Sequence, residues 1–279
     1  MIIEKIINNN IISARDESGN EVVAMGRGIG FGKRPGSEIA DEKIEKVFRL
    51  ENVNDSDQFK KVLASLPIEL FRLSSQIISY AREILEIELN QNIYLALTDH
   101  ISFAIKRQKE GMLFRNALHD EVKLFYPNEY MVGRHALYLI ENETGCRLEE
   151  DEAAAIAIHI VNAELNSEIS TTFLIIKMMR EMMEIIENKI KVPDKVAYPR
   201  DRLITNIKHL AKRLLSEEPL HGRNDLELYH FVKTNYPDEY VLIDKVNQYI
   251  EETYHCSMTE EEKIYLTLNV KRMNDLYAL

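Results

Sequence analysis

An internal repeat constrains the fold of this chain more than any other feature. Residues 121–159 read EVKLFYPNEYMVGRHALYLIENETGCRLEEDEAAAIAIH, and residues 231–269 read FVKTNYPDEYVLIDKVNQYIEETYHCSMTEEEKIYLTLN. Tyr126 aligns with Tyr236, and the same offset of 110 residues holds along both segments. A repeat of this length indicates one structural module that occurs twice.

A shorter upstream segment extends both copies. The stretch DHISFAIKR begins at Asp99 and resembles TNIKHLAKR, which begins at Thr205. We therefore expect two homologous domains, at residues 62–170 and 171–279. The 279 residues of the chain leave room for one smaller domain before them.

Both copies have the period of α-helices. Apolar side chains recur every three or four residues along one segment of the first copy, namely Ile93, Leu97, Ile101, Ala104 and Ile105. Proline is common in the first turn of a helix. Four prolines mark such starts, namely Pro67, Pro127, Pro199 and Pro237. The repeats are predicted to be all-α helical bundles.

The first 57 residues have a different composition. Six of the ten glycines lie within the first 36 residues. Asp16–Asn20 is typical of a hairpin loop, and β-branched segments typical of strands lie at 2–7, 11–14, 21–25 and 44–50. We predict an all-β domain of about four strands at residues 1–57. It is too small to bury much core alone, which favours a partner surface. Residues 52–58 resemble a linker.

Charge limits where a nucleic acid can bind. The whole chain has a net charge of -11, and residues 1–57 hold eight basic and eleven acidic residues. A surface that coats nucleic acid with positive charge is therefore excluded. The stretch Gly26–Arg34 has three basic residues and no acidic one, so it is the candidate patch.

The location predicted for the chain is the cytoplasm. No run of 18 apolar residues is present to insert into a membrane. Glu4 and the asparagines after it interrupt the apolar stretch that a signal peptide needs. Cys146 and Cys256 have no metal-type spacing, so we expect reduced thiols.

The motif GRGIGFGKR at Gly26–Arg34 allows two interpretations. A dinucleotide site is excluded, because the following Pro-Gly predicts a turn where such a site requires a helix. In a strand, alternate side chains would share a face opposite the glycines, namely Arg27, Ile29, Phe31 and Lys33. That face would suit phosphate pairing and base stacking. In the other interpretation, Phe31 is buried in the core of a small domain.

The asparagines Asn8, Asn9 and Asn10 also allow two interpretations. Asparagine amides present a donor and an acceptor together, which can read base edges. Asparagine also tolerates the left-handed backbone of turns between strands. From the residues alone, the turn is the favoured interpretation.

Two histidines lie on predicted helices. His100 follows Asp99 beside the apolar stripe, and His159 lies in the apolar segment AAAIAIHIVNA. Such a histidine is usually a core residue with satisfied hydrogen bonds, but neutral imidazole is also a good nucleophile near pH 7. A phosphate there would add about -1.5 to -2 charges to a packed interface.

Motifs of enzymes are missing from the sequence. It has no Walker loop, no kinase signature and no cysteine pair spaced for a metal. We therefore predict a protein that is not an enzyme and needs no metal or cofactor. Any phosphate on it would come from another phosphoprotein.

Six motifs, in this order, resemble the BglG/SacY/LicT family of bacterial transcriptional antiterminators. They are Asn8–Asn10, GRGIGFGKRPG at 26–36, IEKVF at 44–48, DHISFAI at 99–105, YPNEY at 126–130 and IAIHIVNAE at 156–164. The resemblance covers the whole chain. It implies an N-terminal RNA-binding domain followed by two PTS regulation domains.

For the first domain, the resemblance implies a homodimer that clamps an imperfect RNA hairpin. The stabilised hairpin prevents an overlapping terminator from forming, so transcription continues into sugar-utilisation genes. The residues implied in RNA contact are Lys5, Asn8, Asn10, Gly26, Arg27, Gly28, Gly30 and Phe31.

For the helical domains, the resemblance implies control by phosphate from the sugar phosphotransferase system. The sugar permease would inhibit the first domain through His100 and His159 when sugar is absent, and the carrier HPr often activates the second. The second domain departs from this pattern, because Asn206 aligns with His100 and Asn269 with His159. We expect it to accept no phosphate and to serve in dimer packing. We interpret His209 as structural rather than as a displaced acceptor.

Two other functions stay open at this point. The helical repeats could form a protein-interaction or phosphocarrier module, with the β domain serving only to dimerise it. A DNA-binding activator could use the same regulation domains, but the first domain has predicted strands where a helix-turn-helix is needed. The function predicted is antitermination regulated by histidine phosphorylation.

Overall fold

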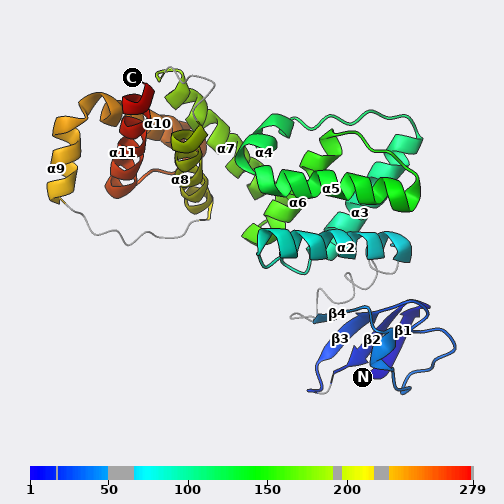
Figure 1. Ribbon diagram of the computed structural model, residues 1–279. Coiled ribbons are helices and arrows are strands. Elements are labelled where there is room, and N and C mark those ends of the chain that lie inside the picture. The colour runs from blue at the N-terminus through cyan, green and yellow to red at the C-terminus, as the bar shows by residue number, and fades with distance from the viewer. Residues whose placement is uncertain (17, 50–65, 191–196, 217–225, 278–279) are drawn as a thin grey trace. The chain divides into compact units, whose positions relative to one another are not determined.

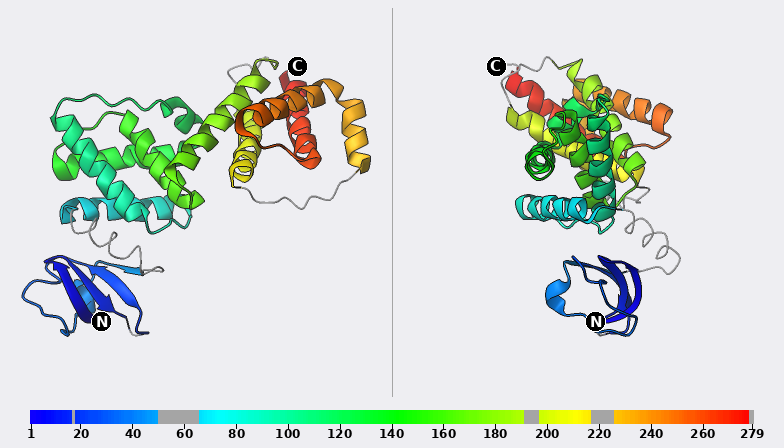
Figure 2. Two further views of the ribbon diagram at one scale, coloured as in Figure 1. Left: turned by 180° about the vertical axis from the view of Figure 1, so that it is seen from behind. Right: turned by 90° about the vertical axis from the view of Figure 1, so that its right-hand side faces the viewer.

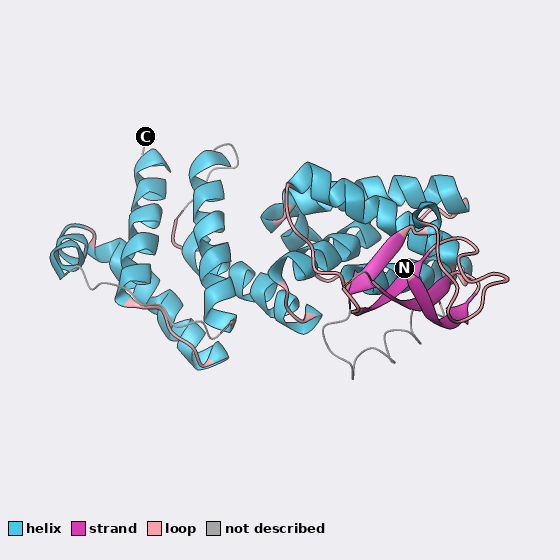
Figure 3. Cartoon of the chain, turned by 90° about the horizontal axis from the view of Figure 1, so that it is seen from below, coloured by secondary structure: helices cyan, strands magenta, loops and turns pink. Residues whose placement is uncertain are grey.

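The computed structural model describes residues 1–16, 18–49, 66–190, 197–216 and 226–277. Within these residues, strands occupy the N-terminal part and helices most of the remainder (Figures 1 and 3). The prediction of a small β domain followed by helical domains is therefore confirmed. The predicted linker at 52–58 lies outside the described residues.

The N-terminal strands form one antiparallel sheet in sequence order. They are β1 (Ile2–Asn8), β2 (Ile11–Arg15), β3 (Glu21–Met25) and β4 (Lys46–Arg49), and two further views show them side by side (Figure 2). A short 3₁₀ helix, Asp41–Lys43, precedes β4. The predicted hairpin loop after β2 is confirmed, because the N–H of Asp16 donates to the carbonyl of Asn20 at 3.0 Å.

Both faces of the sheet are apolar, since successive side chains of a strand point to opposite faces. Ile12 and Val22 belong to a buried cluster on one face, which Ile29 and Ile39 from the loop between β3 and β4 complete. Four side chains of the other face are buried in one cluster with Phe71 of the first helical domain, namely Ile11, Val23, Met25 and Phe48. The small sheet thus gains core from residues outside it.

The first sequence repeat contains five helices among the described residues. They are α2 (Ile68–Leu85), α3 (Ile93–Lys109), α4 (His119–Phe125), α5 (Pro127–Thr144) and α6 (Asp151–Leu165). All five side chains of the predicted stripe on α3 are buried, so its assignment as a core-facing helix is confirmed.

The second repeat gives a matching series of helices in its described part. They are α7 (Ile169–Glu187), α8 (Ala197–Leu215), α9 (Leu226–Asn235), α10 (Pro237–Tyr254) and α11 (Glu260–Tyr277). The expected helix starts are confirmed as well. Pro67 caps α2, Pro127 and Pro237 begin α5 and α10, and Pro199 lies in the first turn of α8. Each proline lacks an N–H that the first turn would leave without an intrahelical partner.

Packing divides the chain into two compact units. The first unit comprises residues 1–116 and 128–166, and the second comprises residues 117–127 and 167–279. Cys146 and Cys256 are free thiols. No helix in the described part of the chain combines the length and the hydropathy needed to cross a membrane.

Candidate nucleic-acid interface and histidine pair

The stretch Gly26–Arg34 is a series of turns, so the strand considered for it is wrong. Gly28 and Gly32 have φ values of +67° and +68°, in the left-handed region that glycine adopts without strain. Such residues break the alternation of an extended strand. Ile29 is consequently buried while Phe31 is exposed, although strand geometry would place both on one face.

Hydrogen bonds tie the asparagine turn to this glycine loop. The N–H groups of Gly26 and Gly30 donate to the carbonyls of Asn10 and Asn9, each at 3.0 Å. The N–H of Gly28 donates to Oδ1 of the Asn10 side chain at 2.9 Å. Three N–H groups of alternate loop residues are thus satisfied by one turn. Asn9 and Asn10 form the turn between β1 and β2, and Asn8 is the last residue of β1, so the turn interpretation is confirmed.

Close backbone approach explains two of the glycines. A Cβ atom at Gly26 would lie 1.9 Å from the carbonyl oxygen of Lys43, and one at Gly30 would lie 2.6 Å from that of Asn8. Side chains do not fit at such distances, so these positions need glycine. The sequence interpretation of a glycine face that another backbone approaches holds for these two residues.

The tied loop presents an aromatic ring and cations to solvent. The side chain of Phe31 is 74% exposed, so the interpretation that buried it in the core is wrong. Arg27, Lys33 and Arg34 are also exposed on the same loop. An exposed ring beside guanidinium and ammonium groups can stack on a base while the cations pair with phosphates.

The remaining predicted RNA contacts differ in their exposure. Lys5 is exposed on β1, whereas Gly26 and Gly30 are buried within the loop. Asn8 and Asn10 are half-buried, and Oδ1 of Asn8 accepts from the N–H of Asn10 at 2.8 Å. The glycines and asparagines therefore shape the loop, and Arg27 and Phe31 offer side chains to a ligand.

The two predicted acceptor histidines meet between α3 and α6. The ring centroids of His100 and His159 lie 4.8 Å apart. Nε2 of His100 lies 3.1 Å from Oε2 of Glu152, whose side chain is 3% exposed. Oε1 of the same carboxylate accepts from the guanidinium of Arg107. Sequence reasoning identified the histidines and missed Glu152 and Arg107.

Burial and neighbouring charges determine the protonation of His159 and Glu152. Desolvation, reinforced by the neighbouring His100, lowers the pKa of His159 to about 3, so the ring is neutral near pH 7. Burial alone would raise the pKa of Glu152, but contacts from His100 and Arg107 outweigh it and hold that pKa below its ordinary value. The cluster therefore contains the neutral imidazole of His159 and the ionised carboxylate of Glu152.

The second unit repeats the ion pair without the histidines. Glu262 aligns with Glu152 at the repeat offset of 110 residues, and Arg213 aligns with Arg107 at the offset of 106. Nε of Arg213 donates to Oε1 of Glu262 at 2.9 Å. Nδ2 of Asn269 donates to a carbonyl of its own helix, at Tyr265, at 2.6 Å.

A tyrosine–glutamate pair is also common to both units. The hydroxyl of Tyr130 donates to Glu150 at 3.0 Å, and that of Tyr240 donates to Glu260 at 2.8 Å. Burial, followed by the glutamate contact, raises the pKa of Tyr130 to about 12. The repeat offset relates both pairs, so comparing aligned polar residues between the copies would have identified them.

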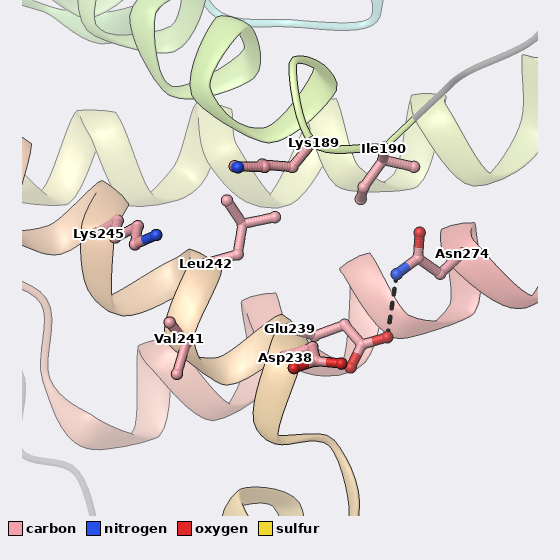
Figure 4. A pocket seen from close by; sticks show the side chains of 8 residues that line it. All are labelled: Lys189, Ile190, Asp238, Glu239, Val241, Leu242, Lys245 and Asn274. Carbon is pink, nitrogen blue, oxygen red and sulfur yellow. Dashed lines mark hydrogen bonds between the residues drawn. The ribbon is translucent and has the colours of Figure 1, made fainter.

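The second unit contains a cavity of about 340 Å³ that the sequence did not predict. Figure 4 shows its lining side chains, among them Lys189, Lys245 and Asp238. Nδ2 of Asn274 donates to Oε1 of Glu239 at its rim, at 3.0 Å. The lining thus mixes both signs of charge. Within the residues that the structure describes, no group of three or more His, Cys, Asp or Glu could hold a metal ion.

Comparison with protein families matches nearly the whole chain. The model of the CAT RNA binding domain matches residues 1–57. The model of the PRD domain matches twice, at residues 75–163 and 180–272. The second of these matches includes both asparagines at the aligned histidine positions, Asn206 and Asn269.

Individual relatives support the same assignment. The chain is 41% identical to transcription antiterminator LicT of Bacillus subtilis (strain 168), over 98% of this chain and 99% of the relative. It is 36% identical to the beta-glucoside operon antiterminator of Dickeya chrysanthemi, over 98% and 96%. The crystal structure of GlcT CAT-PRDI is 37% identical, with a TM-score of 0.52, and covers 58% of this chain and 97% of that one. The chain belongs to the family of transcription antiterminators that join a CAT RNA binding domain to PRD domains.

Proposed function

We propose that this chain binds an RNA hairpin through the loop Gly26–Arg34 and thereby prevents formation of an overlapping terminator. The observation that carries this proposal is the exposed Phe31 ring on a loop with three exposed cations. Stacking on an aromatic ring and pairing with cations are the interactions through which proteins hold unpaired bases of RNA. Asn8 and Asn10 hold the loop in this conformation.

The proposed active species is a homodimer located in the cytoplasm, where nascent transcripts are available. A single loop offers few cations, and the domain at residues 1–57 is net negative. Two loops on one hairpin would double the number of phosphate contacts, and with it the dependence of affinity on salt. Sedimentation of the full chain with and without RNA measures the stoichiometry.

Regulation is proposed to act through phosphate on His100 and His159 of the first PRD domain. The supporting observation is their location in one cluster with the buried Glu152 and with Arg107. A phosphate would place about two negative charges beside a buried carboxylate. That repulsion favours a rearrangement of α3 against α6, so phosphorylation would change the packing of the first PRD domain. A phosphorylated sugar permease is the proposed donor.

Binding of the full chain to an imperfect hairpin and to plain duplex RNA tests the first part of the proposal. The hairpin is expected to bind more tightly, and Arg27→Ala is expected to weaken binding and to flatten the salt dependence. Equal affinity for both RNAs would instead favour the alternative, a protein-interaction or phosphocarrier module whose β domain only dimerises.

Phosphate transfer from purified phosphorylated HPr, followed by peptide mapping, tests the regulatory part. The second PRD domain has Asn206 and Asn269 where the first has histidines, and an amide forms no stable phosphoryl adduct. Label is therefore expected to be absent from residues 171–279. Label found there, for example on His209, would contradict the proposal that this domain accepts no phosphate from HPr.

A further inference from the structure

Two buried atoms face each other in the histidine cluster of the first unit. Nε2 of His100 and Oε2 of Glu152 lie 3.1 Å apart. Both atoms are inaccessible to solvent, and neither makes a hydrogen bond within the described part of the chain, so their contact is a close ionic approach. The His100 side chain as a whole is still 16% exposed. One edge of the ring is therefore sealed against a carboxylate while another part of it reaches solvent.

Arg107 holds the carboxylate in place. Its guanidinium binds Oε1 of Glu152, and its Cζ atom lies 4.1 Å from the ring centroid of Phe114. The Arg107 side chain is only 14% exposed. With one oxygen of Glu152 fixed in this way, the other oxygen is directed at His100.

The second unit provides an internal comparison. Both oxygens of Glu262 accept from Arg213, at 2.9 and 2.5 Å. Oε2 of Glu262 also accepts from the N–H of Thr259, at 2.8 Å. No oxygen of that carboxylate is left to face the position of Asn206. The arginine–glutamate ion pair is thus common to both units. Among the described residues, a carboxylate oxygen that faces the first histidine position is found only in the first unit, where that position is His100.

We infer that Glu152 is a positioning residue, which holds the proton of His100 on Nε2 and so directs phosphoryl transfer to Nδ1 of that histidine. This inference rests on the proposed phosphorylation of the first PRD domain. A carboxylate beside one ring nitrogen fixes the tautomer, because that nitrogen carries the hydrogen and the other keeps its lone pair. Nε2 is also the nitrogen that no donor can reach, since it is buried.

The transfer step is a nucleophilic displacement at phosphorus. The lone pair of Nδ1 forms the new P–N bond as the P–N bond of a phosphorylated nitrogen donor breaks. The donor nitrogen leaves with the electron pair and takes a proton from solvent. The proton on Nε2 stays on the ring, where the charge of Glu152 stabilises the imidazolium character that develops. No oxidant, reductant or metal takes part.

The test uses the full chain and phosphoramidate, a small phosphoryl donor that needs no protein docking. Phosphorylated histidines are located by peptide mapping, and ³¹P NMR distinguishes the Nδ1 and Nε2 isomers. His100 is expected to carry phosphate on Nδ1. His209 of the same chain serves as the control, because its side chain is exposed and both isomers should form on it.

Two variants separate positioning from folding. Glu152→Gln is expected to slow labelling of His100 about 10- to 100-fold, the usual effect of losing a carboxylate that orients a histidine, and to yield both isomers. Glu262→Gln removes the aligned carboxylate of the second unit and should leave labelling of His100 unchanged. If Glu152→Gln fails to fold, the phosphohistidine isomer that forms on His100 of the wild-type chain decides the matter by itself.

The outcomes distinguish the inference from the function on which it rests. Phosphate on Nε2 of His100, or unaltered labelling in folded Glu152→Gln, would overturn the inference and leave regulation by phosphate intact. Label on His159 but not on His100 would do the same. If neither histidine is labelled, by phosphoramidate or by the phosphorylated sugar permease, both the inference and the proposed regulation fail.

Discussion

At the scale of single residues, Gly30 and Phe31 are neighbours with opposite roles in the same loop. A methyl group at Gly30 would lie 2.6 Å from the carbonyl oxygen of Asn8. Gly30→Ala is therefore expected to destabilise the N-terminal domain by about 2 kcal/mol, as overpacking does, and to weaken hairpin binding because the loop moves. Chemical unfolding and RNA titration of the full chain measure both effects.

Phe31→Ala is the matched control for that substitution. The exposed ring contributes little to folding, so the free energy of unfolding should change by less than about 0.5 kcal/mol. Loss of stacking should still weaken hairpin binding by about 1 to 3 kcal/mol. Tight binding by Phe31→Ala would show that the ring does not touch RNA.

The largely buried ring of His159 makes stability depend on pH. Its pKa is lowered to about 3 in the folded chain, below the ordinary value of 6.5, so the unfolded chain binds a proton more readily. The free energy of unfolding should consequently fall as the pH is lowered from 6.5 to 5, by up to about 1.4 kcal/mol per pH unit from this residue. His159→Asn, which copies the side chain of Asn269, should reduce that slope.

The pH range and a control variant separate the contribution of His159 to stability from those of Glu152 and of an exposed histidine. Glu152 has a lowered pKa, so its effect on stability is lost only at pH values below its ordinary range. His209→Asn changes an exposed histidine and should leave the slope as it is. Thermal unfolding across this window decides the matter: an equal slope in wild type and His159→Asn would contradict a buried neutral ring.

At the scale of elements, periodicity predicted most of what the structure contains. The stripe on α3 and the proline starts are local patterns, and their geometry follows from helix spacing. The loop after β3 was interpreted wrongly, because glycine at every second residue imitates the period of a strand. The positive φ of Gly28 and Gly32 decides its conformation, and a sequence of letters does not reveal which glycines use that freedom.

The candidate site was predicted only in part, for a similar reason. His100 and His159 are conspicuous because they interrupt apolar helices. Glu152 lies in the first turn of α6, where an acidic residue is expected for its interaction with the helix dipole. Because an acidic residue is common at this position, nothing in the sequence indicated that Glu152 contacts His100. The pairing with Arg107 depends on the packing of α3 against α6, which spacing along one helix cannot show.

Helix α11 has a capping interaction that α6 lacks. The N–H of Thr259 donates to Oε2 of Glu262 at 2.8 Å, and the N–H of Glu262 donates to Oγ1 of Thr259 at 3.3 Å, which is a capping box. Thr259→Ala is therefore expected to lower the free energy of unfolding by about 1 kcal/mol. Glu149 occupies the aligned position before α6, and Glu149→Ala should have a smaller effect. Equal losses in calorimetry would contradict the capping role.

At the scale of the whole molecule, two copies of one module have diverged at a few positions. The Arg–Glu and Tyr–Glu contacts are present in both copies, so they serve the shared fold. The histidines are present in one copy only. Signals carried by phosphate should therefore enter through the first PRD domain. The carboxylate of the second is instead occupied in capping its own helix.

This difference predicts how histidines restored to the second domain will behave. The double variant Asn206→His and Asn269→His is expected to accept phosphate there about 10-fold more slowly than His100 does, since both oxygens of Glu262 are engaged. Adding Thr259→Ala removes the hydroxyl contact to Oε2 and weakens the cap, which leaves that oxygen freer to turn toward residue 206. The labelling rate of the second domain and its share of the Nδ1 isomer should then rise. Rates equal to that of His100 before Thr259 is changed would show that the carboxylate does not limit the reaction, and that the asparagines alone keep this domain free of phosphate.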